Sequence, residues 1–169
     1  MRIDNVMRCF QEITQRNADI YVEGGKIVEK PWKLNAPVEQ SKIDMFEQKG
    51  YKIPVELKTI LSVSDGICCI STEHSIHNID TMLELVEINA GTLIPGVYEF
   101  AYFLGDSLYI DSARIDSGNY ILYEGKGFNN GLLLGYGITT FFEHLLTSNF
   151  SNYWRWVYEE REHIPFLQE

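Results

Sequence analysis

The sequence has few cysteines, and they are not placed to form disulfides. Cys9, Cys68 and Cys69 are an odd number, and the two adjacent ones are poorly placed to pair with each other. Neither a CxxC pair nor a Cys/His ligand spacing occurs, which argues against a redox or metal role. We therefore expect reduced thiols, with Cys68 and Cys69 buried on a strand.

Long apolar runs are also missing. No segment approaches the ~18 uninterrupted apolar residues that a membrane span requires. Near the N-terminus, Arg8 and Cys9 interrupt the apolar stretch, so it does not have the pattern of a signal peptide. These absences predict a cytoplasmic protein that does not bind a membrane.

Basic residues are scarce relative to acidic ones. The chain carries 14 Lys and Arg against 24 Asp and Glu, which gives a formal net charge of −10. Nucleic-acid binding draws much of its affinity from Lys and Arg, so a nucleic-acid partner is not expected. Acidity by itself usually indicates no more than solubility, but it would also steer association with a basic protein, an interpretation that needs support from other features.

The first half of the chain is dominated by helical patterns. Apolar residues at helical spacing predict a helix over residues 3–17 and another over 39–50. A third is expected between Pro54 and Gly66, which suit a helix start and a helix end. Glycines and prolines between the first two predict a largely irregular segment, from which Trp32 and Leu34 fold back onto the core. The pattern then predicts a buried strand over 67–70 and a polar loop through residue 77. Over 81–89 the period alone does not separate helix from strand, and a helix is favoured.

The second half changes to strands. Three β-rich runs follow Pro95, separated by turns at Gly105–Asp106 and Asp116–Gly118, and a fourth run covers residues 132–136. Thr140 and Glu143 have the capping-box spacing of a helix start. A tail helix is expected from residue 153 to 163. This order predicts one α+β domain over residues 1–169, with a mainly antiparallel twisted sheet covered by helices.

The sequence contains no convincing catalytic, cofactor or metal motif. His74 and His77 are three residues apart but lie in the predicted polar loop, so a solvated pair is favoured over a metal site. Asp106, Asp111 and Asp116 could serve acid–base chemistry or hold a cation, but turn formation explains Asp106 and Asp116 more simply. The run GKGFNNG lacks the order of a phosphate-binding loop and is expected to form a hairpin turn. We therefore expect a protein that is not an enzyme.

One stretch of about thirty residues resembles a known family. A helix is followed by a G-x-x-(I/L)-P-x-x-(L/F)-K-like element that ends in an Asp-Gly pair before a strand. The matching positions are Ile43, Phe46, Glu47, Gly50, Ile53, Pro54, Leu57, Leu61, Asp65 and Gly66. This pattern resembles the SUKH superfamily, the Smi/Knr-type domain. Gly105 with Asp106, Tyr109 with Asp111 and the helix over 141–146 extend a looser resemblance over residues 36–148, with the N-terminal helix and the aromatic tail outside it.

The resemblance implies a protein-binding domain with a SUKH-like fold. In bacteria such domains are commonly immunity proteins that bind a secreted or contact-dependent toxin, which can be a nuclease. In fungi they include regulatory scaffolds. The family has no shared catalytic residues to carry over, and it leaves the oligomeric state open.

Exposed acids and tyrosines on the sheet and its turns are the expected anchors of a protein partner, because tyrosine is enriched in interface hot spots. They are Glu99, Tyr102, Asp106, Tyr109, Asp111, Asp116, Tyr123 and Glu124. The sequence leaves two alternatives to an immunity protein: a Smi/Knr-type scaffold that binds a housekeeping partner, and a hydrolase that uses Asp106 and Asp111.

Overall fold

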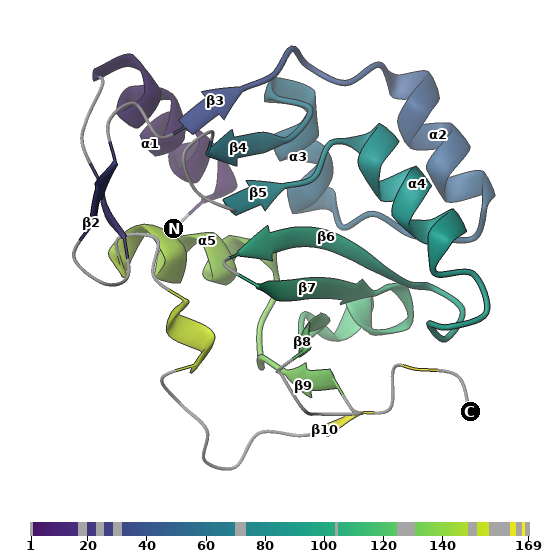
Figure 1. Ribbon diagram of the computed structural model, residues 1–169. Helices are drawn as coiled ribbons and strands as arrows, with labels where there is room; N and C mark the ends of the chain where they lie inside the picture. The colour runs from purple at the N-terminus through teal and green to yellow at the C-terminus, as the bar shows by residue number, and fades with distance from the viewer. Residues whose placement is uncertain are drawn as a thin grey trace.

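The fold was taken from a computed structural model (Figure 1). It describes residues 2–16, 20–22, 26–28, 32–69, 74–103, 105–124, 131–148, 152–155, 163–164 and 167. The helices are α1 (Ile3–Arg16), α2 (Gln40–Gln48), α3 (Val55–Val63), α4 (Ile79–Ile88), α5 (Ile138–Thr147) and the 3-10 helices η1 (Ser112–Ser117) and η2 (Tyr153–Arg155). The strands are β1 (Ile20–Val22), β2 (Lys26–Val28), β3 (Trp32–Leu34), β4 (Ile67–Cys69), β5 (His74–Ile76), β6 (Val97–Phe103), β7 (Asp106–Asp111), β8 (Ile121–Glu124), β9 (Gly131–Leu133) and β10 (His163–Ile164).

Within the described part of the chain, eight of these strands form one antiparallel sheet. Its order is β10-β9-β8-β7-β6-β5-β4-β3, while β1 and β2 pair separately. Strands that follow one another along the chain are therefore neighbours, as in a meander, with α4 inserted between β5 and β6. The predicted α+β class, with helices covering a twisted antiparallel sheet, is confirmed (Figure 1).

One face of the sheet, called here the inner face, packs against helices. Side chains alternate between the two faces of a strand, and a β-bulge between Glu99 and Ala101 shifts this alternation in β6. Tyr98, Phe100 and Phe103 therefore all enter the same core. Phe100 contacts Phe141 of α5 edge-on, with 5.7 Å between ring centroids. Helices α1, α3 and α5 also contact one another (Figure 1). The main core thus lies between this helical layer and the inner face.

The opposite face, called here the outer face, is more polar. One row runs across adjacent strands through paired positions, in the order Lys33, Cys68, Ser75, Tyr102, Ser107 and Glu124. A second row pairs Glu99 with Tyr109 and continues to the leucines of β8 and β9. Part of this row belongs to a small apolar cluster of Leu93, Val97, Tyr109, Leu122 and Leu133.

The residues behind the SUKH resemblance stabilise the fold. Glu47 accepts a hydrogen bond from the Ile53 N–H at 3.1 Å, and Asp65 accepts one from the Ile79 N–H at 2.8 Å. Gly66 has a φ of +86° and lies so close to Asn78 that a Cβ would come within 2.8 Å of its backbone nitrogen. Pro54 begins α3, as expected.

Several predicted elements differ from the structure. The segment before α2 is not simply irregular, because residues 32–34 add β3 to the edge of the sheet, and Leu34 packs on the core as predicted. The predicted loop through His77 contains β5, whose polar residues satisfy their backbone groups by pairing with β4 and β6. The GKGFNNG turn lies outside the described residues except for Gly131. Cys68 is a half-buried free thiol on β4, and the side chain of Cys69 is not described.

Two helix predictions near the C-terminus were also wrong in detail. Helix α5 begins at Ile138 after Gly137, so Thr140 and Glu143 do not form a capping box. The reason is that the Tyr120 hydroxyl accepts the Ile138 N–H at 3.0 Å and caps the helix from another strand's end. The expected tail helix ends as η2 at Arg155, while His163 belongs to β10, and residues 156–162 lie outside the described part.

Candidate functional site

The predicted partner-binding residues divide into buried and accessible side chains. Asp106 has no exposed surface, and Asp111 and Tyr123 are also buried. The expectation that Asp106 and Asp111 are exposed acids was therefore wrong. The sequence pattern predicted a turn at Asp106, but Asp106 is the first residue of β7, and Asp111 is its last.

Asp106 is enclosed by hydrogen-bond donors from the C-terminal part of the chain. Its carboxylate accepts bonds from Asn152 Nδ2 at 3.0 Å, from Trp154 Nε1 at 2.9 Å, and from Arg155 Nε and Nη2 at 2.6 Å each. The Tyr123 hydroxyl lies 3.5 Å away. Asp106 hydrogen bonding raises the pKa of Arg155. We name this set the Asp106 cluster, and its geometry gives Asp106 a structural role.

Asp111 lies just before η1, and Asp116 lies within it. Asp111 accepts a hydrogen bond from the Ala113 N–H at 2.9 Å and lies 3.3 Å from Arg114 Nε. Asp116 is exposed, as expected. Asp106 and Asp111 occupy opposite ends of β7 and, five residues apart, point to opposite faces. The hydrolase alternative, which required these two carboxylates to converge, gains no support from this arrangement.

Glu99, Tyr102, Tyr109 and Glu124 come together on the outer face. Buried Tyr109 donates its hydroxyl hydrogen to Glu124 Oε2 at 2.7 Å and stands opposite Glu99 across the strands. Burial, followed by the hydrogen bond to Glu124 and the charge of Glu99, raises the pKa of Tyr109 well above its ordinary value. The phenol thus stays a neutral donor between two carboxylates, with half-buried Tyr102 next to them.

The two histidines near β5 do not form a solvated pair. His74 is buried against Phe103 on the inner face, and burial lowers its pKa to about 4. His77 lies between Ser75 Oγ, at 3.3 Å from Nδ1, and Glu99 Oε1, at 3.0 Å from Nε2. Among the described residues no His, Cys, Asp and Glu cluster could hold a metal ion.

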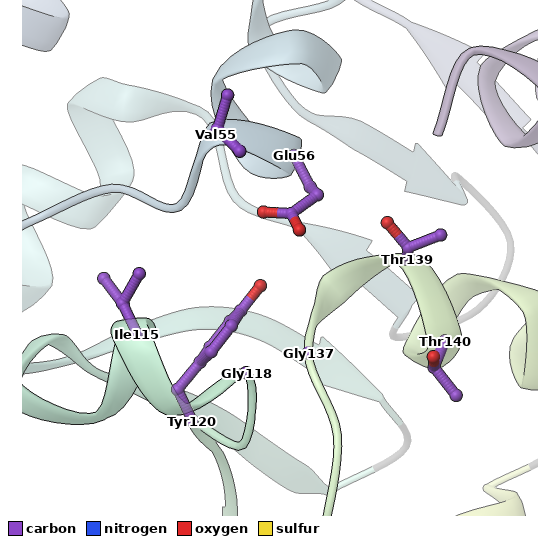
Figure 2. A pocket seen from close by; sticks show the side chains of 8 residues that line it. All are labelled: Val55, Glu56, Ile115, Gly118, Tyr120, Gly137, Thr139 and Thr140. Atoms are coloured by element: carbon purple, nitrogen blue, oxygen red, sulfur yellow. The ribbon is translucent and has the colours of Figure 1, made fainter. Parts of the chain in front are cut away.

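A pocket that the sequence analysis missed lies where α3, α5 and η1 approach one another (Figure 2). Its volume is about 380 Å³, and its lining residues are Val55, Glu56, Ile115, Gly118, Tyr120, Gly137, Thr139 and Thr140. They come from the first turns of two helices and from the segment around η1. No short motif could predict the pocket, because its walls are far apart in sequence.

The pocket combines an apolar edge with a carboxylate. Val55 is 71% exposed, one of the few large apolar side chains left open to solvent in the described chain. Figure 2 shows the Glu56 carboxylate and the Tyr120 hydroxyl directed toward each other. Burial, opposed by the hydrogen bond from the Ile138 N–H and reinforced by nearby Glu56, raises the pKa of Tyr120 to about 12. Tyr120 is therefore neutral, and Glu56 carries the negative charge of this site.

The comparisons with known proteins leave the family open. The sequence matches no protein-family model, and no curated protein is significantly similar to it. Among the described helices, none combines the length and apolar character that crossing a bilayer requires.

Proposed function

We propose that this protein is a non-catalytic binding module that recognises a basic protein partner through the outer face of its sheet. The single observation that carries the proposal is the grouping of Glu99, Tyr102 and Glu124 on one face of the sheet, on β6 and β8, the two strands that flank β7. Rigid strands hold the carboxylates and the tyrosine in fixed relative positions, which reduces the entropy lost on binding.

Charge and composition support this proposal. Two carboxylates beside tyrosines provide an acidic patch with an aromatic centre, and the chain as a whole has a net charge of −10. The Tyr109 hydroxyl orients the Glu124 carboxylate, and the His77 ring orients the Glu99 carboxylate. A partner with Lys and Arg at its surface would replace solvent around Glu124 and Tyr102 while these supporting contacts stay in place.

The SUKH resemblance refines the partner class. Immunity proteins of that superfamily neutralise toxins by direct binding, and a toxin that acts on nucleic acid needs a basic surface of its own. An immunity protein against such a toxin is therefore the specific form of the proposal. A regulatory scaffold for a housekeeping protein is the alternative, favoured by the same acidic patch but by no additional observation.

A pull-down of the tagged protein from its native host, with mass spectrometry of the bound proteins, separates these two forms. Stoichiometric recovery of a toxin domain supports the immunity protein, and recovery of a housekeeping complex supports the scaffold. Recovery of no protein partner would contradict the binding function itself.

Once a partner is in hand, the outer face can be tested by affinity measurements at two salt concentrations. The double variant Tyr102→Ala/Glu124→Gln should weaken binding at least tenfold, or about 1.4 kcal/mol, and reduce its dependence on salt. Glu84→Gln is the matched control, because Glu84 is an exposed acid on α4. Equal affinities for the double variant and the wild type would show that another surface binds the partner. Variants at Asp106 are unsuitable here because they would disturb the core.

A further inference from the structure

The pocket beside α3 and α5 contains an acid that lacks an ion-pair partner among the described residues. Glu47 and Asp111, by contrast, have ion-pair partners, Lys58 at 2.8 Å and Arg114 at 3.3 Å respectively. Glu56 interacts with the neutral Tyr120 phenol, which cannot balance its charge. A half-buried carboxylate in a pocket gains from a cation that is brought to it.

We propose that this pocket receives a single Arg or Lys side chain from the protein partner, an inference that rests on the proposed binding function. The exposed Val55 and half-buried Ile115 would contact the aliphatic stem of that side chain, and Glu56 would accept hydrogen bonds from its charged end. The Thr139 and Thr140 hydroxyls line the same pocket and supply further acceptors.

The size of the pocket suits this occupant. Its volume of about 380 Å³ lies at the lower end of the roughly 300–1,000 Å³ typical of ligand pockets. One extended side chain and a few waters, each with a share of roughly 30 Å³, would occupy such a space. An anchor of this kind is how a small number of interface residues come to dominate binding energy.

Helix dipoles oppose a cation in this pocket and need to be weighed. The first turns of α3 and α5 each present the equivalent of about half a positive charge. The first amide of α5 is already bonded to Tyr120, and Glu56 itself lies in the first turn of α3, where it offsets that helix's dipole. An anion would have to approach the full charge of Glu56, so the cation remains the favoured occupant.

The test uses the intact protein and small probes in nuclear magnetic resonance titrations. N-acetyl-arginine amide should shift the amide signals of Glu56, Thr139 and Thr140, whereas uncharged N-acetyl-norleucine amide and acidic N-acetyl-aspartate amide should not. Glu56→Gln should weaken the response at least tenfold, about 1.4 kcal/mol, and Glu84→Gln should leave it unchanged. Thermal unfolding of Glu56→Gln checks that the variant is folded.

The outcomes separate this inference from the proposed function. Shifts with N-acetyl-aspartate amide alone, or equal responses from wild type and Glu56→Gln, would overturn the cationic pocket. With a recovered partner, Glu56→Gln should also lower affinity; an unchanged affinity overturns the inference while leaving the outer-face proposal standing. If no partner protein is recovered but the arginine probe still binds at Glu56, the proposed function fails and the cation pocket itself survives.

Discussion

The two faces of the sheet hold their carboxylates in different ways. On the inner face, Asp106 has no exposed surface and accepts hydrogen bonds from three C-terminal side chains. On the outer face, and within the described part of the chain, Glu99 and Glu124 each accept a hydrogen bond from one side chain, His77 and Tyr109 respectively. A carboxylate with its acceptor positions filled stabilises the fold, whereas one with positions left over can also bind. The difference shows why an acidic residue on a strand is not in itself a binding residue.

Removing the inner-face charge should have the largest effect. In Asp106→Asn, Arg155 keeps its charge in a site built for an ion pair, so we expect a loss on the order of 3 kcal/mol in the free energy of unfolding. Urea unfolding followed by circular dichroism measures it. The exposed Asp116→Asn should change stability by less than about 0.5 kcal/mol. Similar small changes for both variants would mean that the Asp106 cluster contributes little.

The inner face should also respond to pH through His74. Its pKa is about 4 in the folded protein against an ordinary 6.5, so the unfolded chain binds the extra proton between these values. The contribution of His74 to the free energy of unfolding is complete above about pH 6.5 and is lost as the pH falls toward 4. The loss amounts to about 2 kcal/mol at pH 5. Urea unfolding at several pH values checks this. His74→Gln should flatten the slope in this window, and an unchanged slope would assign it to other groups.

A steric clash at the N-terminal start of α5 should lower the free energy of unfolding by less than the loss of the Asp106 charge does. In Gly137→Ala, the new Cβ would lie 2.7 Å from the Tyr120 hydroxyl oxygen, so the ring must move and its bond to Ile138 weakens. We expect a loss of about 1–2 kcal/mol in thermal or urea unfolding. On a Tyr120→Leu background, the same substitution should cost clearly less. Equal costs in both backgrounds would show that the clash is not the cause.

On the outer face, removal of one hydroxyl should have the smallest effect on stability. Tyr109→Phe keeps the buried ring and deletes the bond to Glu124, for an expected loss of about 0.5–1 kcal/mol. Urea unfolding gives the value, with Tyr102→Phe as the comparison on the same face. If Tyr109→Phe lowered the free energy of unfolding as much as Asp106→Asn does, the polar groups of the two faces would contribute equally to stability.

The sequence predicted elements with local signals better than groups assembled over distance. Helix α3 was found because Pro54 and Gly66 mark its ends, whereas for α4 the period alone did not separate helix from strand and a helix was only favoured. The capping of α5 was not predicted, since the acceptor is Tyr120 and not a residue of the helix start. Strand β5 was missed because His74 and Ser75 are polar and their neighbours on both sides determine that they form a strand.

The candidate site followed the same division. The sequence indicated that Glu99, Tyr102 and Glu124 belong to the sheet. It did not reveal the β-bulge between Glu99 and Ala101, which places Glu99 and Tyr102, three residues apart on β6, on the same face. Burial of Asp106 could not be inferred, because the donors Asn152, Trp154 and Arg155 lie 46 to 49 residues away along the chain. The Glu56 pocket requires the relative placement of α3 and α5, which no local pattern contains.

The distance in sequence between Asp106 and Arg155 also bears on how the protein is made. During synthesis β6 to β8 leave the ribosome before Arg155, and until then the carboxylate at the start of β7 lacks the cation that it pairs with in the folded protein. Burying it at that stage would be unfavourable, so the nascent sheet should stay partly hydrated at this edge. Its final packing therefore waits for the C-terminal segment, and a chain that stalls before residue 155 should be an easy substrate for proteases.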